Sequence, residues 1–423
     1  MAEGAAGSCK LEAGYGKLEA GRWALVNGRV VLPEAVVEDQ ALLIEDGRIA
    51  AVVPGSDVSV SSGMPRIDAG GRLITPGLID IHTHGALGHT FNEPTAEAFA
   101  AITAENARQG VTSLLATVTT APLEDMVQCL EFTSRWMSEA HAGAQVLGVH
   151  LEGPYFNPAQ QGAQDPESIR TPDDGSADRL LEWHKVLRIV TFAPELSGAL
   201  DFTTRVARLA LVPAAGHSAA TDAEVRAAME RGLRHVVHLW SSQSSTIRRG
   251  PWRVPGLLEA SLASDELTAE IIADNRHLPP TLMTLAFKCL GPDRLCAVSD
   301  ASSGAGFPEG AFYRMGRLEY EVHDGVGMLL DHSAFAGSTT LLNRMVPVLR
   351  DAVGIPLAHA VRMVTLTPAR IIGVDRRKGS LEAGKDADIT IFDDDFTAWG
   401  VVIGGCLVLP ADADNGQKRH AVL

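Results

Sequence analysis

Eight short apolar runs recur between residues 77 and 302, and they constrain the fold more than any other feature of the chain. In order they read GLIDIHTH, VTSLLATVTT, VLGVHLEG, RIVTFAPE, LALVPAAGHS, HVVHLWSS, TAEIIADN and LCAVSDAS. Helix-like segments separate many of them, including one that opens on Thr221 with Glu224 at the spacing of a capping box. Strands without polar alternation are typical of a parallel sheet buried on both faces. Eight such strands alternating with helices predict an α/β fold, a (β/α)8 TIM barrel.

The two ends of the chain differ from this middle. From Trp23 onward, short β-rich runs are separated by Asn-Gly and Asp-Gly turns, and similar runs return after residue 374. We therefore predict a small β-sandwich domain assembled from residues 22–75 and 374–423, with the barrel over residues 76–373. Residues 1–21 lack the apolar region of a signal peptide and are predicted to form a flexible tail.

Charge and cysteine content limit the partners of the chain. The formal net charge of −16 argues against binding to nucleic acid or to an anionic membrane. The five cysteines are scattered and form no CxxC pair, which is typical of reduced thiols in the cytoplasm. No apolar run approaches the roughly 18 residues that a membrane span needs. The sequence therefore predicts a cytoplasmic protein that binds neither nucleic acid nor a membrane.

Most of the apolar runs end in a residue that can bind a metal ion or transfer a proton. In chain order these residues are His82 and His84, His150 and Glu152, Glu195, His217, His238, Asp274 and Asp300. In a barrel the carboxyl ends of the strands meet on one face, where active sites lie. Imidazoles and carboxylates without thiolates suit a divalent transition metal such as zinc, iron, manganese or cobalt.

Five of these positions suggest particular roles. His82 and His84 share one face of an extended strand and are predicted to bind one metal ion together. Asp300, after the last run, suits a general base beside metal-bound water. His150 is expected to be a buried, hydrogen-bonded histidine outside the metal set, and Glu195 to orient a ligand.

Several motifs resemble those of one family, notably PGLIDIHTHG, GVHLEGPYFNPAQQGA, GHSAATDAEV and VSDASSGAG. Over roughly residues 22–400 the chain is similar to the N-acetylglucosamine-6-phosphate deacetylase family of the amidohydrolase superfamily. The resemblance implies a metal-dependent hydrolase that removes the N-acetyl group from N-acetylglucosamine-6-phosphate or a close N-acetylated amino sugar. The products would be the free amine and acetate, and the assembly a homodimer.

The resemblance also implies a metal site. Glu152, His217 and His238 match its ligands, and His82 and His84 are able to hold a second ion, so that one or two ions are expected.

Three residues match positions of the family that take part in the reaction or contact the substrate. Asp300 matches the aspartate that takes a proton from metal-bound water and passes it to the leaving amine. Arg253, in RVPGL, matches a phosphate-binding arginine that reaches across a dimer interface, although the alternative is a solvated surface turn. His277 matches a substrate-contacting histidine, with a capping or core histidine as the alternative.

The chain departs from the family at its substrate-binding positions. Ser241, followed by Ser242, stands where the family has an asparagine that holds substrate. Gln164 stands where the family has a substrate-contacting histidine. Removal of an acyl group is therefore better supported than the exact sugar phosphate.

Two alternatives remain at this point. A cyclic amide hydrolase of the dihydroorotase or hydantoinase kind needs a lysine at the end of the fourth strand, but Lys185 precedes that run and Glu152 supplies the bridging carboxylate. A catalytically inactive barrel used for binding usually loses a ligand or the acid, and here none is missing.

Overall fold

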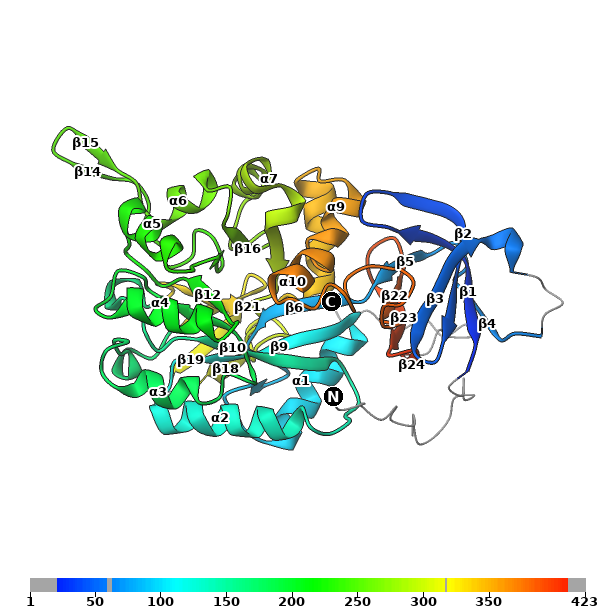
Figure 1. The fold of residues 1–423 in the computed structure, drawn as a ribbon, viewed down its shortest axis with the longest axis horizontal. Coiled ribbons are helices and arrows are strands. Elements are labelled where there is room, and N and C mark those ends of the chain that lie inside the picture. Colours follow the sequence, from blue (N-terminus) through cyan, green and yellow to red (C-terminus); the bar gives the residue numbers. More distant parts are fainter. Residues whose placement is uncertain (1–20, 59–62, 316–317, 410–423) are drawn as a thin grey trace.

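A computed structural model describes residues 21–58, 63–315 and 318–409. The predicted tail 1–21 and the end of the second terminal segment, 410–423, lie almost wholly outside the described residues. Figure 1 shows a barrel wrapped by helices and, beside it, a small sheet built from the two ends of the chain. Within the described residues, no helix is both long and apolar enough to cross a membrane.

The barrel consists of eight parallel strands, which coincide with the eight apolar runs. They are β6 (Leu78–Thr83), β9 (Val111–Thr119), β10 (Gln145–Glu152), β11 (Leu187–Phe192), β12 (Val212–Ala215), β13 (His235–Val236), β16 (Thr268–Ile272) and β17 (Leu295–Val298). Their order in the sheet follows the chain from β6 to β17. A parallel bridge between Thr83 and Ala301 closes the ring, and the Asp300 amide donates to the His82 carbonyl at 2.9 Å. The predicted (β/α)8 barrel is confirmed.

Helices cover the outside of the barrel and bury its apolar strands. They are α1 (Ala96–Arg108), α2 (Leu123–Trp136), α3 (Ser176–Leu181), α4 (Ala199–Arg208), α5 (Asp222–Glu230), α6 (Leu257–Ala263), α7 (Pro280–Arg294), α8 (Met345–Pro347), α9 (Leu357–Arg362) and α10 (Leu366–Ile371). The capping box of Thr221 and Glu224 is present at the start of α5. Because both faces of the strands are covered, side chains such as Leu114, Val149 and Ile271 are fully buried in one continuous core.

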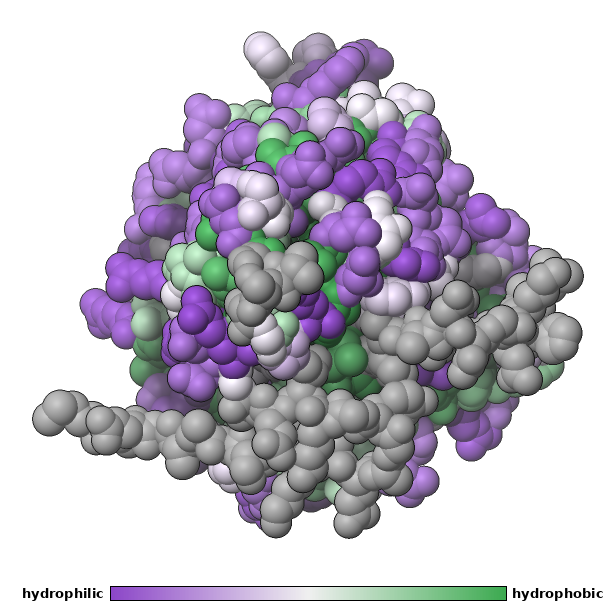
Figure 2. All heavy atoms as spheres, turned by 90° about the vertical axis from the view of Figure 1, so that its right-hand side faces the viewer, coloured by the Kyte–Doolittle hydropathy of each residue, from purple (hydrophilic) through white to green (hydrophobic). Residues whose placement is uncertain are grey.

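The small sheet joins the two ends of the chain. Its strands are β1 (Trp23–Val31), β2 (Val36–Glu45), β3 (Arg48–Pro54), β4 (Arg66–Asp68), β5 (Leu73–Pro76), β22 (Ile389–Phe392), β23 (Ala398–Ile403) and β24 (Cys406–Leu409). The antiparallel pairing of β5 with β22 links the N-terminal and C-terminal strands. Trp23, Leu42 and Ile389 belong to a separate buried cluster in this sheet. On the end of the molecule seen in Figure 2, hydrophilic side chains predominate and hydrophobic ones lie mostly in recesses between them.

Three short antiparallel units are added to the barrel. The strands β18 (Phe312–Met315), β19 (Leu318–His323), β20 (Val326–Leu329) and β21 (Phe335–Ser338) form a sheet after the last barrel strand, and β7 (Gly85–Ala86) pairs with β8 (His89–Thr90). The third unit, β14 (Ile247–Arg249) with β15 (Trp252–Val254), projects away from the barrel at the upper left of Figure 1.

Candidate metal centre and active site

The residues singled out at the ends of the apolar runs come together at one end of the barrel. His82 lies in β6 and Glu152 is the last residue of β10, whereas His217, His238 and Asp300 lie two residues beyond β12, β13 and β17. The last three have positive φ angles of 48°, 25° and 45°. Left-handed backbone is uncommon outside glycine and collects at functional sites. The chain thus turns sharply as it leaves three strands, and their side chains converge.

The Glu152 carboxylate is the centre of this group. Its Oε1 lies 3.2 Å from His217 Nε2, 3.1 Å from His238 Nε2 and 3.4 Å from His82 Nε2. Its Oε2 lies 3.4 Å from His84 Nε2. All five side chains are buried. One carboxylate is therefore shared by four imidazoles from three other strand ends.

Asp300 completes the group on the side of the first strand. Its Oδ1 is 3.1 Å from His84 Nε2 and 3.5 Å from His82 Nε2. The aspartate therefore faces the two histidines of the HxH pair, and it is largely buried.

The nitrogen atoms are arranged as a cation site requires. His217 donates its Nδ1 hydrogen to the Gln160 carbonyl at 3.0 Å, which leaves a lone pair on Nε2. Among the described residues, the buried Nε2 of His82 has no hydrogen-bond partner. Two groups of three residues, His82 with His84 and Glu152, and Glu152 with His217 and His238, keep their donor atoms within 4.8 Å of one another. This set fits one divalent transition metal ion or two.

The surroundings keep both acids ionised. Burial opposes the charge of Glu152, but the imidazoles of His82, His217 and His238 hold the pKa of its carboxyl well below the usual range. Burial likewise opposes the charge of Asp300, whose pKa is nevertheless lowered by His82 and His84. Both carboxylates are therefore charged at neutral pH.

A cavity of about 290 Å³ opens onto this centre. Nine of the eleven predicted site residues line it: His84, Glu152, Gln164, His217, His238, Ser241, Ser242, His277 and Asp300. His82 lies behind the wall and is fully buried. His277 is held by its Nδ1–H, which donates to Asp274 Oδ2 at 2.8 Å, so that Nε2 remains for other contacts. The cavity is thus lined both by metal-type ligands and by other polar side chains, Gln164, Ser241, Ser242 and His277.

Gln164 is bonded to the centre itself. Its Nε2 donates to Glu152 Oε2 at 2.7 Å, while its Oε1 accepts hydrogen bonds from Thr119 Oγ1 at 2.6 Å and from the Thr120 amide at 3.0 Å. The side chain is therefore fixed, and it holds one oxygen of Glu152. Nearby, Gly162 has a φ of +57°, and a Cβ there would lie 2.5 Å from Ser242 Oγ, so the loop needs glycine to pass this close.

Arg253 lies outside the cavity. It is on β15 of the projecting hairpin, and its guanidinium donates to the Pro251 carbonyl at 3.3 Å. The neighbouring side chains Trp252 and Ile247 are 74% and 49% exposed, which is unusual for large apolar residues. In this chain alone, the hairpin does not bring Arg253 to the metal-type ligands.

Two further residues take supporting positions. Glu195 accepts hydrogen bonds from Ser218 Oγ at 2.8 Å and from the Ala219 amide at 2.5 Å, so it organises the turn directly after His217. His150 is fully buried, and both of its nitrogens are engaged, by the Ile81 carbonyl at 3.1 Å and by Thr191 Oγ1 at 2.7 Å. Exclusion of His150 from the ligand set agrees with these contacts.

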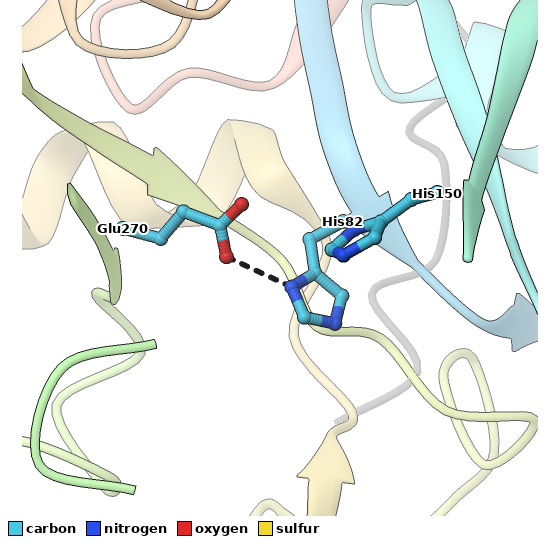
Figure 3. A group of neighbouring side chains, drawn as sticks. All are labelled: His82, His150 and Glu270. Carbon is cyan, nitrogen blue, oxygen red and sulfur yellow. Dashed lines mark hydrogen bonds and ion pairs between the residues drawn. The ribbon is translucent and has the colours of Figure 1, made fainter. Parts of the chain in front are cut away.

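Sequence reasoning missed Glu270. This glutamate lies in β16, within TAEIIADN, and its Oε2 is 2.8 Å from His82 Nδ1 (Figure 3). It is fully buried. The available signal was the acidic residue itself, because a charge within a buried apolar strand needs a partner.

A TIM barrel with imidazoles and carboxylates at its strand ends defines a class of metal-dependent hydrolases, and the comparison with known families agrees. The model of the Amidohydrolase family matches residues 73–408. The chain therefore belongs to the amidohydrolase family.

Comparison with individual proteins shows which members of the family this chain is similar to. The chain is 34% identical to N-acetylgalactosamine-6-phosphate deacetylase of Escherichia coli O157:H7, over 85% of this chain and 92% of that protein. It is 32% identical to N-acetylglucosamine-6-phosphate deacetylase of Haemophilus influenzae, over 88% and 95% of the two chains. The solved structure of an aspartate-to-alanine mutant of the Mycobacterium smegmatis N-acetyl-D-glucosamine-6-phosphate deacetylase, in complex with N-acetyl-D-glucosamine-6-phosphate, superposes with a TM-score of 0.85 at 29% identity, covering 92% of this chain and 100% of that one. The resemblance inferred from the motifs is confirmed.

Proposed function

We propose that the protein is a metal-dependent deacetylase of an N-acetylated amino sugar 6-phosphate, N-acetylglucosamine-6-phosphate or a close relative. The observation that carries the proposal is the convergence of Glu152, four histidines and Asp300 at one end of the barrel, where all of them except His82 line one cavity. The relatives named above act on the N-acetyl derivatives of both glucosamine-6-phosphate and galactosamine-6-phosphate. The reaction is hydrolysis of the amide to the free amine and acetate.

Glu152, His217 and His238 are the proposed ligands of one ion, and His82 and His84 those of a second. Zinc, iron, manganese and cobalt all suit this donor set. A divalent ion bound there supplies Lewis acidity toward a carbonyl oxygen and toward water. The donor atoms come from strand ends rather than flexible loops, which keeps their geometry rigid.

Asp300 is the proposed proton carrier. Its carboxylate is ionised and faces the cavity, so it can accept a proton from the water that attacks the carbonyl carbon. When the carbon–nitrogen bond breaks, the same group donates that proton to the amine nitrogen, which would otherwise leave as a poor anion. The water thus supplies one oxygen to acetate. One of its protons ends on the amine nitrogen, and the other is released as acetic acid ionises to acetate.

The polar lining of the cavity outside the metal-type ligands is the proposed sugar site. Ser241, Ser242 and His277 present hydroxyl and imidazole groups suited to sugar hydroxyls. Gln164 lines the same cavity, but its amide is already bonded to Glu152 and to Thr119. We infer that Gln164 acts chiefly through Glu152, and that Ser241 replaces the asparagine contact.

Arg253 is the proposed phosphate-binding residue, supplied across a homodimer. An arginine can grip phosphate with charge-assisted, bidentate hydrogen bonds. The projecting hairpin with exposed Trp252 and Ile247 is the kind of surface that a second copy of the chain would cover. Mixing Asp300→Asn chains with Arg253→Ala chains tests this arrangement, because a shared site should regain activity only in mixed dimers.

Cyclic amide hydrolysis is disfavoured by the fourth barrel strand. After β11 the chain continues as Ala193, Pro194 and Glu195, with no lysine where that chemistry needs one. A catalytically inactive barrel used for binding is also disfavoured, because the proposed metal ligands and a buried acid are all present. The absence of any membrane-crossing helix within the described part of the chain is compatible with the cytoplasmic location we propose.

The decisive experiment combines metal analysis with a substrate panel. Protein purified without chelator should contain at least one transition metal ion per chain. It should release acetate from the 6-phosphates of N-acetylglucosamine or N-acetylgalactosamine faster than from the unphosphorylated sugars. Turnover of dihydroorotate in place of these amides, or full activity in metal-free protein, would overturn the proposal.

A further inference from the structure

Glu270 faces the metal centre from behind His82. Figure 3 shows the His82 imidazole with the Glu270 carboxylate opposite its Nδ1 and the ring of His150 beside it. The Glu270 Oε2 to His82 Nδ1 distance is 2.8 Å, and both residues are fully buried. A carboxylate only accepts hydrogen bonds, so Nδ1 must carry the proton. In the neutral ring, the form that can bind a metal ion, the lone pair is then on Nε2, which lies 3.4 Å from Glu152 Oε1.

The three residues in Figure 3 do not form an ion site of their own. Their donor atoms lie within 4.8 Å of one another, yet both nitrogens of His150 are already bonded, to the Ile81 carbonyl and to Thr191 Oγ1. The near oxygen of Glu270 is occupied by His82. Glu270 therefore contacts a proposed ligand rather than an ion.

The remaining contacts hold Glu270 in place. Its Oε1 is 3.0 Å from His235 Nε2, and His235 Nδ1 is 2.8 Å from Thr268 Oγ1. Its Oε2 also accepts the backbone N–H of His238 at 3.4 Å. One buried carboxylate thus touches the ring of His82 and the backbone of His238, and a second histidine fixes it from the far side.

We propose that Glu270 is a positioning residue of the metal centre, which holds His82 as its Nδ1–H tautomer and aims Nε2 at the bound ion. A carboxylate behind a ligating histidine fixes the ring and raises the basicity of the nitrogen that binds the metal. The inference rests on the metal centre proposed above and adds a residue outside its ligand set.

Two substitutions separate the charge of Glu270 from its shape. Glu270→Gln keeps the volume and an oxygen for His82 Nδ1–H, while its amide can donate to His235 once that ring takes its other tautomer. Glu270→Ala removes both contacts. His150→Gln is the matched control. His150 is equally buried, and the centroid of its ring lies 4.3 Å from that of His82, but it takes no part in the hydrogen bond between His82 and Glu270.

The readout is binding of Co²⁺ to metal-free protein, measured by competition with a chelator and by the visible spectrum of the bound ion. We expect Glu270→Gln to weaken the binding of the ion that His82 contacts by about 10- to 100-fold, the usual effect of losing such a partner. Glu270→Ala should weaken it at least as much, and His150→Gln should stay within about threefold of the parent. Melting temperatures of the metal-free proteins show how much each change costs the fold alone.

Each outcome bears on one proposal. Parent-like Co²⁺ affinity and spectrum in Glu270→Gln and Glu270→Ala would overturn the positioning role. So would an equal loss in His150→Gln, which would indicate general damage to the core. If Glu270→Ala does not fold, the Co²⁺ affinities of Glu270→Gln and of the charge-retaining Glu270→Asp test the positioning role instead. A parent protein that binds no Co²⁺ at all would instead refute the metal centre itself.

Discussion

Two clusters of buried charged side chains differ in how fully their charges are matched. In the first, beside β22, Lys378 and Asp388 are 5% and 6% exposed. Lys378 Nζ donates to Asp388 and lies 3.4 Å from Asp386, and Asp388 Oδ1 accepts the Gly404 amide at 2.8 Å. Every charge there has an opposite charge or a hydrogen bond.

The cluster at the mouth of the barrel is built differently. Within the described residues, the ion-pair partners of Glu152 and Asp300 are all histidines, and the Nε2 of His82 is left without a hydrogen bond. Unsatisfied buried polar atoms are rare in folded proteins and call for a functional reason. From this comparison we infer that the matched cluster holds the fold, whereas the unmatched one is the place of the proposed cation.

Removal of the shared carboxylate should have the largest effect. Glu152→Gln should lower activity by at least about 10³-fold, because Lewis-acid assistance is worth several kcal/mol. Metal content per chain should fall with it, while the circular dichroism spectrum stays that of the parent. Elemental analysis and kcat on the same sample check this, and a variant that keeps its ions and its rate would place the metal elsewhere.

Loss of the proton carrier should come next. Asp300→Asn is nearly isosteric and should lower kcat by about 10²- to 10⁴-fold, the usual contribution of general acid–base catalysis. KM should change little. Because Asp300 lies close to the proposed ligands His82 and His84, metal content must be measured alongside. Turnover within tenfold of the parent at full metal occupancy would remove Asp300 from the mechanism.

Breaking the matched cluster should affect stability instead. Lys378→Met leaves Asp388 buried without its cation, which typically costs about 3–5 kcal/mol. Denaturant unfolding should show this loss, while kcat and metal content of the folded protein remain those of the parent. A parent-like unfolding midpoint, or an activity loss without destabilisation, would contradict the structural role.

Arg253 belongs to neither cluster and should show the smallest effect. Arg253→Ala should raise KM for a phosphorylated substrate by about 10- to 100-fold, since a hydrogen bond to a charged group is worth about 1.5–3 kcal/mol. KM for the unphosphorylated sugar should stay constant. Arg248→Ala, directly across the same hairpin, is the matched control. Equal changes in KM for both substrates would show that Arg253 does not bind the phosphate group.

The barrel and its polar mouth were predictable from the chain alone. Eight apolar runs alternate with helices, and strands connected through helices run parallel, so that all their carboxyl ends lie on one face. Residues at the carboxyl ends of the strands within those runs, such as Glu152, His217 and His238, must then lie near one another whatever the details of packing. The order and direction of the strands determine this proximity, and both can be predicted from the pattern of apolar runs and helices.

Tertiary structure alone decided which side chains touch. The bond from Gln164 to Glu152 and the bond from Glu270 to His82 each join residues from different elements, 12 and 188 positions apart. The exposed position of Arg253 likewise depends on how its hairpin leaves the barrel. Such contacts depend on strand register, barrel stagger and side-chain rotamers, which shift an atom by several ångströms without changing the sequence pattern. A hydrogen bond tolerates only a few tenths of an ångström, so the sequence determined the neighbourhood and the packed fold selected the partners.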